Sequence, residues 1–597
     1  MKTLLSCTLL VSTLFGFTQS NIICTNSEIE NVLEGNYTPS NYEATDVIND
    51  HQQILCEIDN QLSTDSLKSY LEVLESFQTR NTYSDTISLV SGIGAARNWV
   101  NSKFKEFSAD SENRLLTGFL QFDWIGGSCG DGLGFRNVLA VLPGTDATKD
   151  IIIIEAHMDS RCEDNCDIAC LAPGMEDNGS GTALVMELAR VMSQFTYDRT
   201  IVFMATVGEE HGLFGAEAMS QYCVDHNVAI KAVQNNDVVG GVTCGTTSSP
   251  PSCPGLGDID STQVRLFSSG SLSQTSRGFA RTIKMNYKEK MMANVAVPMT
   301  ISIMNQEDRS GRGGDHIPFR EDGFRSIRFT SANEHGDANI NTSYTDRQHT
   351  SDDVLGIDNN GDQILDEYYV DFNYLKRNAV INGMSVTIMA LGPQSPTFTL
   401  YDEPSGLRVG FSSPLDGLKY RIGVRSPASP VDFSAVYGTT DTSFIIPGLT
   451  SGSIYYVSVA VVDYNGIMSP FSQEEFGFSN ATTDSVAQET LSFTFNCNAL
   501  GLEHLDVNRS KVLLECFPNP FTNETQLRFN LREQFNNCEG EILITDLQGR
   551  VVDVVPITIS SGLNTLAYTP KFNSGYYNCT LLINNASVGS GKMIVLH

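Results

Sequence analysis

Strand and helix patterns alternate along the first two thirds of the chain, and this alternation restricts the fold more than any other feature. Short apolar runs typical of buried strands occur at residues 137–142, 151–156, 200–207, 229–239 and 324–330. Helical periodicity is found at residues 181–195 and 215–222, and a long helix is expected at 369–389. This order predicts an α/β domain with a mostly parallel sheet and helices on both of its faces.

The limits of the first segments follow from changes in composition along the 597 residues. Residues 1–20 have the pattern of a secretory signal peptide, with Lys2, an apolar stretch and then small or polar residues. Residues 21–60 are polar and lack sustained periodicity, which indicates an N-terminal extension or propeptide. The α/β domain is then expected at residues 61–391, with amphipathic helices around 67–77 and 95–107 at its start.

A β-rich segment follows the α/β domain. Residues 392–485 begin with a Pro-rich stretch and continue with short alternating strands and turn residues, which predicts a small β-sandwich. Within it, residues 449–459 resemble the late strands of fibronectin type III domains, in which a tyrosine, here Tyr455, anchors a corner. Residues 486–512 are expected to be a linker.

The final segment, residues 513–597, is again rich in β patterns. Its Cys-Phe-Pro-Asn-Pro-Phe sequence at 516–521 and the pieces at 546–550, 575–577 and 592–597 resemble the C-terminal sorting domain of type IX secretion substrates. The resemblance implies export through the periplasm and outer membrane, with the secretion machinery as a partner and a secreted or cell-surface location. The alternative is a further adhesive sandwich.

Charge and cysteine content restrict the partners and the compartment. Acidic residues outnumber basic ones by 70 to 38, so the net charge of −32 opposes nucleic acid binding. No stretch after the signal approaches the 18 consecutive apolar residues of a membrane span. Fourteen cysteines in an exported chain indicate disulfides, although their connectivity stays open. Cys162, Cys166 and Cys170 are therefore expected to form disulfides rather than a metal site.

Candidate metal ligands occur where predicted strands end. His157 follows the strand at 151–156, and Glu210 follows the strand at 200–207 together with its neighbour Glu209. Asp237 closes the strand near 233–236, and Asp177 lies in a Gly-rich loop before a helix. Open α/β sheets place their sites at these carboxyl ends of strands, so the side chains are expected to meet.

Imidazole nitrogen and carboxylate oxygen suit zinc, and two zinc ions ~3.5 to 4 Å apart need a carboxylate that bridges them. Asp177 is the expected bridge. One ion is then expected to take His157 and Asp237, and the other Glu210 and His349. This pattern predicts a centre of two Zn²⁺ ions.

Two further acidic residues have expected roles beside the ligands. Glu209 is expected to face a water activated by the two metals and to act as general base, because adjacent residues on a turn point in different directions. Asp159, in the sequence His-Met-Asp, is expected to accept the other N–H of the His157 imidazole and so fix its tautomer.

The motifs that contain these residues resemble those of the bacterial leucyl aminopeptidase-type zinc peptidases. They are Ala-His-Met-Asp-Ser at 156–160, Glu-Asp-Asn-Gly-Ser-Gly at 176–181, Gly-Glu-Glu-His-Gly-Leu-Phe-Gly at 208–215, Asn-Asp at 236–237 and Gln-His-Thr at 348–350. The resemblance covers about residues 60–391 and implies a secreted aminopeptidase that acts on peptides or proteins with the same ligands and base. Asp315 and His316 also resemble a family segment near the pocket, with either a direct or a structural role for His316.

Two other functions stay open. The same family contains carboxypeptidases, one-zinc glutaminyl cyclases and receptor domains without metal, and the presence of both His157 and Asp237 argues against the last two. Carboxypeptidase or dipeptidase activity needs cationic groups for a substrate carboxylate, for which Arg309, Arg312 and Arg320 are candidates. A non-catalytic surface adhesin is the alternative from another class, and the complete ligand set argues against it.

Overall fold

A computed structural model gives the structure of most of the chain. It describes residues 18–246, 255–272, 274–309, 312–334, 346–362, 364–411, 419–488, 497, 512–531, 538–545, 550–560, 562–583 and 586–596. Most of the expected signal peptide, residues 1–17, and most of the expected linker lie outside the described residues. The chain divides into two compact units, Met1–Phe495 and Asn496–His597.

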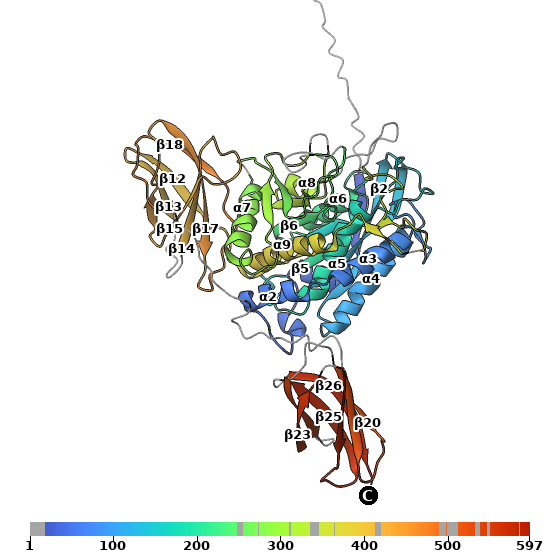
Figure 1. The fold of residues 1–597 in the computed structure, drawn as a ribbon. Coiled ribbons are helices and arrows are strands. Elements are labelled where there is room, and N and C mark those ends of the chain that lie inside the picture. Colours follow the sequence, from blue (N-terminus) through green and yellow to red (C-terminus); the bar gives the residue numbers. More distant parts are fainter. Residues whose placement is uncertain are drawn as a thin grey trace, which may run out of the picture. The chain divides into compact units, whose positions relative to one another are not determined.

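A nine-stranded sheet forms the centre of the first unit (Figure 1). Its strands, in sheet order, are β1 (Thr18–Cys24), β2 (Leu116–Gly127), β3 (Gly130–Leu142), β5 (Ile201–Thr206), β4 (Ile151–His157), β6 (Ile230–Asn236), β9 (Ser326–Ser331), β7 (Gln263–Ser268) and β8 (Thr300–Ile303). The central strands β5, β4, β6 and β9 pair in parallel, whereas β1, β2 and β3 pair antiparallel at one edge. The predicted α/β fold is confirmed, and the sheet is mixed.

Helices cover both faces of this sheet (Figure 1). On one face lie α4 (Gly92–Asp110), α5 (Ser180–Met192) and α9 (Phe372–Leu391), with α2 (His51–Gln61) and α3 (Thr64–Ser76) packed against α5 and α9. On the other lie α6 (Phe214–Asp225) and α8 (His316–Glu321), which contact each other. Every residue of α5 is buried, because this helix is enclosed between the sheet and the other helices.

The N-terminal residues, for which the polar composition predicts an extension or propeptide, pack on the α/β domain. β1 pairs with β2 at the edge of the sheet, and α1 (Ser27–Leu33) follows it. Ile54, Leu55 and Ile58 of α2 are fully buried against the domain. A few apolar residues per element are enough for this packing, and such short elements leave little periodicity in the sequence.

The segment after α9 forms two antiparallel sheets. One contains β12 (Phe398–Glu403), β13 (Gly406–Phe411) and β16 (Ser443–Ile445), and the other contains β15 (Ala435–Thr439), β14 (Lys419–Arg425), β17 (Ser453–Val462) and β18 (Glu475–Ser479). Leu407, Val409, Ile422 and Val459 are fully buried in the core of this segment. The Tyr455 hydroxyl accepts a hydrogen bond of 2.9 Å from the backbone N–H of Thr450.

The sandwich contacts the α/β domain through α7 (Ser276–Asn286). Glu474, directly before β18, receives hydrogen bonds from Arg425 of β14 and from Arg281 of α7. Phe471 lies in a small apolar cluster with Met285, the residue before the end of α7. The contact therefore combines apolar packing with a largely buried ion-pair group.

The second unit is also a two-sheet β structure. One sheet contains β19 (Val512–Leu513), β26 (Ala586–Val595), β25 (Gly575–Ile583), β22 (Cys538–Thr545) and β23 (Val551–Ile559), and the other contains β20 (Glu515–Phe517), β21 (Thr525–Leu531) and β24 (Gly562–Tyr568). Leu527, Ile542, Ile544 and Leu581 are fully buried in its core.

In the parts of the chain that the structure describes, every helix is too short or too polar to cross a membrane.

Candidate metal centre

Acidic and imidazole groups gather at the carboxyl ends of three neighbouring parallel strands. His157 is the last residue of β4, and Asp237 directly follows β6. Glu209 and Glu210 lie in the turn after β5, which Gly208 opens with a φ of 78°, a backbone conformation that favours glycine. β4 lies between β5 and β6, so these strand ends meet at one edge of the sheet.

Asp177 faces the imidazole rings of two histidines at this edge. Its Oδ1 lies 3.2 Å from His157 Nε2, and its Oδ2 lies 3.0 Å from His349 Nε2. His157 Nε2 is also 3.4 Å from an Asp237 carboxylate oxygen, and His349 Nε2 is 3.2 Å from Glu210 Oε2. All five side chains expected to bind metal are therefore brought together, with Asp177 between the two histidines.

The loop that carries Asp177 is held by polar groups from distant segments. The Asp353 carboxylate accepts hydrogen bonds from the backbone N–H groups of Glu176, at 2.9 Å, and Asp177, at 3.0 Å. Arg80 is fully buried and donates to Gly174 O at 2.8 Å, to Met158 O at 2.6 Å and to Pro173 O. Arg80 thus connects the loop of Asp177 to the residue that follows His157.

Asp159 has different partners from those expected. The His157 Nδ1 atom lies 3.1 Å from the backbone oxygen of Asp159 but 3.7 Å from its carboxylate. The carboxylate instead accepts from Thr82 Oγ1 at 2.9 Å and from the backbone N–H groups of Glu209 and Glu210 at 3.4 and 3.3 Å. A backbone carbonyl fixes the imidazole, and the Asp159 side chain holds the turn that carries Glu209.

Glu209 lines a cavity of about 360 Å³ together with the ligand residues. Burial raises the pKa of the Glu209 carboxyl well above its ordinary value; the charge of His157 opposes this shift, and the Asp237 and Glu210 carboxylates add to it. A glutamate with a raised proton affinity beside a cavity has the character of a general base or acid.

Asp237 is held from behind by a buried arginine. Arg328 is fully buried, and its Nε lies 3.0 Å from Asp237 Oδ2. The same guanidinium group contacts Asp308 at 2.8 Å and Glu334 at 3.2 Å. Burial raises the pKa of Asp237, but Arg328 and His157 outweigh it, so the net pKa is lowered and the carboxylate stays ionised.

His316 does not line the cavity. It is fully buried at the start of α8, where its Nε2 lies 3.1 Å from the backbone oxygen of Glu307. Its neighbour Asp315 accepts a hydrogen bond of 2.5 Å from Thr206 Oγ1, and burial raises the pKa of Asp315 to about 7. Of the two roles left open for His316, these contacts favour the structural one.

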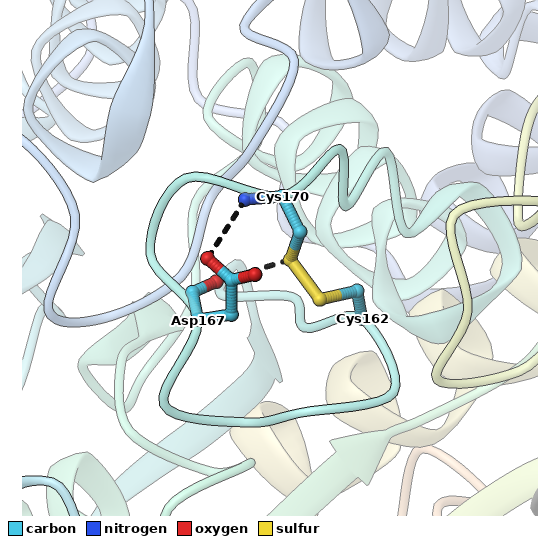
Figure 2. Close-up of side chains that lie close together, drawn as sticks. All are labelled: Cys162, Asp167 and Cys170. Carbon is cyan, nitrogen blue, oxygen red and sulfur yellow. Dashed lines mark hydrogen bonds between the residues drawn. A yellow bond between two sulfur atoms is a disulfide. The ribbon is translucent and has the colours of Figure 1, made fainter.

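A loop closed by disulfides lies beside the site. Cys162 and Cys170 form one disulfide (Figure 2), and Cys166 is joined to Cys129 in the turn between β2 and β3. The Asp167 carboxylate near the first disulfide accepts a hydrogen bond from the backbone N–H of Cys170 (Figure 2). The structure pairs these cysteines with other cysteines, as the sequence predicts, and Asp167 has a structural partner.

Unusual backbone conformations occur around the cavity. Leu213, Val238 and His349 have φ angles of 65°, 56° and 61°, which residues other than glycine rarely adopt. Leu213 and His349 line the cavity, and Val238 follows Asp237. Strain of this kind persists where surrounding contacts fix it, and it clusters at functional sites.

Comparisons with known proteins agree with this geometry. Residues 137–368 match Peptidase family M28. A probable zinc metalloprotease of Pyrenophora tritici-repentis is 32% identical over 355 residues, which cover 58% of this chain and 78% of that protein. The chain belongs to peptidase family M28.

Other similarities of this M28 peptidase are more distant. A probable zinc metalloprotease of Leptosphaeria maculans is 29% identical over 345 residues. This region covers 56% of this chain and 76% of that protein. The LapA aminopeptidase structure from Legionella pneumophila is 18% identical, with a TM-score of 0.41, over 59% of this chain and 80% of that chain. Residues 515–596 match the secretion system C-terminal sorting domain. This match confirms the sorting domain predicted for residues 513–597.

The donor set of this M28 peptidase fits zinc. Two imidazole nitrogens and three carboxylates converge, and the candidate ligand atoms of His157, Asp177 and Glu210 lie within 4.8 Å of one another. Among the described residues, no group donates a hydrogen bond to the buried Glu210 Oε1. An unsatisfied buried carboxylate oxygen in such a cluster is what a metal ligand requires.

Proposed function

We propose that this M28 peptidase is a secreted aminopeptidase with two zinc ions. The observation that carries the proposal is the placement of Asp177, whose two carboxylate oxygens face His157 Nε2 and His349 Nε2 separately. A carboxylate in this position suits a bridge between two ions. His157 and Asp237 would complete one ligand set, and Glu210 and His349 the other.

The residues of the chain have distinct roles in this proposal. Zinc, when bound, supplies Lewis acidity toward water and the scissile carbonyl. Glu209 removes a proton from the attacking water and later returns it to the leaving amine. Asp159 acts through the turn of Glu209, because its carboxylate accepts hydrogen bonds from that turn.

Two segments, one at each end of the chain, support the proposal that the protein is exported. The signal-peptide pattern of residues 1–20 and the match of residues 515–596 to a secretion sorting domain support release at the outer membrane or the cell surface. Between the catalytic domain and the tail, the Tyr455 hydroxyl and its bond to Thr450 support a fibronectin type III-like domain at residues 392–485.

Substitution of the proposed base tests the mechanism. In Glu209→Gln, turnover of unblocked peptides is expected to fall by roughly 10²- to 10⁴-fold, because the side chain no longer accepts a proton. Zinc content is expected to stay at the wild-type value, since Glu209 is not among the proposed ligands. Near-native activity of Glu209→Gln would contradict the mechanism.

Peptides blocked at one end separate the aminopeptidase from the carboxypeptidase or dipeptidase alternative. We expect cleavage of peptides with a free N-terminus and a blocked C-terminus, and no cleavage when the N-terminus is acetylated. Arg320, one candidate for carboxylate binding, pairs with Glu307 at 2.6 Å and does not line the cavity. Cleavage of N-acetylated peptides would contradict the aminopeptidase proposal.

A further inference from the structure

Arginine is concentrated in the cavity beside the proposed zinc ligands. Arg161, Arg309 and Arg312 are three of its twelve lining residues. The chain has only 38 lysines and arginines among 597 residues, so the cavity is much richer in cationic groups than the composition predicts. Four carboxylates line the same cavity, those of Asp177, Glu209, Glu210 and Asp237, and three of them are proposed zinc ligands. The arginines are therefore the lining groups suited to a negatively charged part of a substrate.

Arg309 is held within the protein. Its guanidinium group contacts Asp308 at 3.1 Å and the Glu334 carboxylate, and it donates to Gly313 O at 3.3 Å. These contacts hold the guanidinium group against the protein on three sides, so Arg309 supports the wall of the cavity rather than a ligand.

Arg161 and Arg312 converge on one side of the site. Arg161 Nη2 lies 2.6 Å from His349 Nδ1, and Arg161 Nε lies 3.0 Å from Glu210 Oε2. Arg312 Nη1 donates to the side-chain oxygen of Gln348, the neighbour of His349, at 3.1 Å. Both guanidinium groups therefore flank the Gln348–His349 pair, whereas Asp237 lies beside His157.

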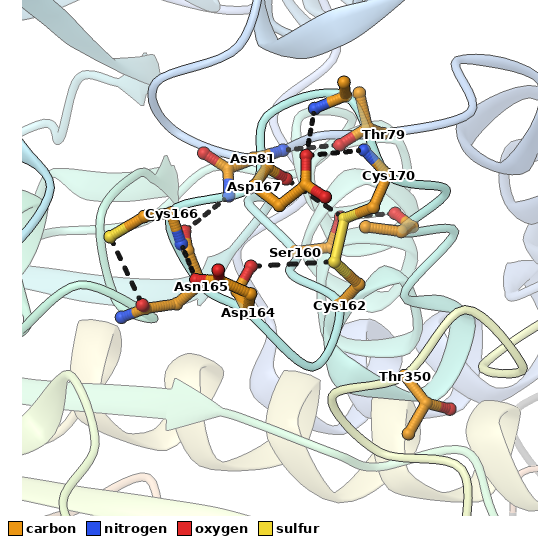
Figure 3. The surroundings of a disulfide bond; sticks show 12 residues. Thr79, Asn81, Ser160, Cys162, Asp164, Asn165, Cys166, Asp167, Cys170 and Thr350 are labelled. Atoms are coloured by element: carbon orange, nitrogen blue, oxygen red, sulfur yellow. Dashed lines mark hydrogen bonds between the residues drawn. A yellow bond between two sulfur atoms is a disulfide. The ribbon is translucent and has the colours of Figure 1, made fainter. Parts of the chain in front are cut away.

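The loop of Arg161 is fixed before any ligand binds. Arg161 is followed by Cys162, whose disulfide to Cys170 closes the loop (Figure 3). Asn81 donates to the backbone oxygen of Asn165 at 2.9 Å (Figure 3). The second disulfide joins Cys166 to Cys129. Because the loop is already ordered, binding through Arg161 costs less conformational entropy than binding through a mobile loop.

We infer that Arg161 and Arg312 form a subsite for a substrate carboxylate on the residue that follows the scissile bond. This inference rests on the proposed aminopeptidase function. Guanidinium groups pair with carboxylates through two parallel hydrogen bonds, which fixes position as well as charge. Because Asp177 lies between His157 and His349, we place the free amine on the side of His157 and Asp237 and the substrate carboxylate on the side of His349.

Two substrates present this carboxylate. One is a dipeptide, whose α-carboxylate lies on the second residue. The other is a longer peptide with Asp or Glu in second position. The shared chemistry is a carboxylate next to the bond that is cleaved, and separate substrate pairs distinguish the two sources.

Paired substrates test the subsite with the full-length, zinc-loaded protein. The first pair is Leu-Gly and its C-terminal amide, and the second is amidated Leu-Asp-Ala-Ala and amidated Leu-Asn-Ala-Ala. We expect kcat/KM to be higher for the acidic member of at least one pair, by about 10- to 100-fold, because hydrogen bonds to charged groups contribute this much. Removal of both guanidinium groups in the double variant R161Q/R312Q is expected to abolish the preference.

The ratio within each pair is the decisive quantity, because it cancels any change in zinc content caused by the contact of Arg161 with Glu210 and His349. R320Q is the matched control, since Arg320 does not line the cavity, and it is expected to keep the wild-type ratio. The variant R161K/R312K retains the positive charges but cannot form bidentate hydrogen bonds. It is expected to keep part of the preference for the acidic substrate.

A binding measurement adds a result that does not depend on turnover. Zinc-loaded Glu209→Gln, titrated calorimetrically with Leu-Gly and with Leu-Gly amide, is expected to bind the free acid more tightly, and R161Q/R312Q in that background is expected to remove the difference. The subsite would be overturned if wild type cleaved both members of each substrate pair with equal kcat/KM, or if the preference survived in R161Q/R312Q. In either case the aminopeptidase proposal would stand. Failure to cleave any unblocked peptide would contradict the aminopeptidase proposal instead.

Discussion

At the residue scale, the site depends as much on the groups that hold the ligands as on the ligands themselves. Arg80 connects the segments of His157 and Asp177, Asp353 accepts from the backbone of Asp177, and Arg328 contacts Asp237. Each of these three side chains is buried and comes from a different part of the chain. Preorganised donors and acceptors of this kind keep metal ligands in their binding geometry.

Thr82 gives a prediction at this scale. Its hydroxyl donates to Asp159 Oδ2 and accepts from Gly208 N–H at 3.0 Å, so it ties Asp159 to the turn of Glu209. Thr82→Val preserves the shape but leaves the buried Gly208 N–H without its acceptor and Asp159 Oδ2 with only the 3.3 Å contact from the Glu210 N–H, which is expected to lower the free energy of unfolding by about 1–3 kcal/mol.

We also expect Thr82→Val to lower kcat, because the turn that positions Glu209 loses a contact. Thr82→Ser keeps the hydroxyl and is the control, with both quantities close to wild type. Denaturant unfolding and steady-state kinetics measure the two effects. Wild-type stability of Thr82→Val would show that the hydroxyl contributes nothing.

The same scale shows what sequence could predict. Four of the five expected ligands and Glu209 are adjacent to strand ends or to a Gly-rich loop, and these local signals led to them, whereas His349 has no such signal and is marked only by the resemblance of its Gln-His-Thr motif. Thr82, Arg80, Asp353 and Arg328 are single polar residues without a motif, and only the folded chain brings them to the site. The backbone oxygen of Asp159 lies nearer to the His157 imidazole than the expected carboxylate does, and sequence does not show this because local backbone direction decides which atom faces the ring.

At the element scale, the buried central strands were predictable and the strands at and beside the two edges were not. The predicted strands at 151–156 and 200–207 correspond to β4 and β5, whose residues are all buried. β1, β2, β7 and β8 were missed; β1 and β8 are the edge strands, and β2 and β7 lie next to them. β1 and β8 are partly exposed, and β7, although buried, contains Arg265, so their apolar patterns are short or interrupted.

The contact between α7 and the sandwich gives a prediction for its bridging residue. Glu474 is 9% exposed and lies 2.6 Å from Arg281 and 2.8 Å from Arg425. Glu474→Gln leaves two largely buried arginines without their counter-charge, which is expected to cost about 3 to 5 kcal/mol of unfolding free energy at pH 7. Glu403→Gln, which disrupts the more exposed pair with Arg408, is the control and is expected to cost about 1 kcal/mol or less.

The pH dependence of this contact has a definite sign. Burial raises the pKa of Glu474, but the hydrogen bond from Arg425 and the charge of Arg281 outweigh it, so the net pKa is lowered. A lowered pKa in the folded state stabilises the protein above the ordinary pKa of glutamate, and this stability is lost as the pH falls through the folded value. The stability difference between wild type and Glu474→Gln is therefore expected to shrink below pH ~4. A difference that is constant from pH 7 to that range would contradict the role of the charge.

At the scale of the whole molecule, the cavity is richer in arginine than the acidic chain as a whole. The chain has a net charge of −32, yet three arginines line the cavity beside the proposed zinc ligands. Acidity outside keeps an exported protein soluble and opposes binding of polyanions. Of the three arginines, Arg161 and Arg312 act only over the short distances of the cavity, where the proposed subsite takes a single carboxylate rather than an extended anion.

The central claim is that Asp177 bridges two zinc ions. The most direct test strips full-length protein with a chelator, titrates it with zinc, and measures bound metal per chain by atomic emission for wild type and Asp177→Asn. The proposal predicts two zinc ions per chain in wild type and at most one in Asp177→Asn, because the amide cannot bridge two cations. Saturation of wild type at one ion, or two ions retained by Asp177→Asn, would contradict it.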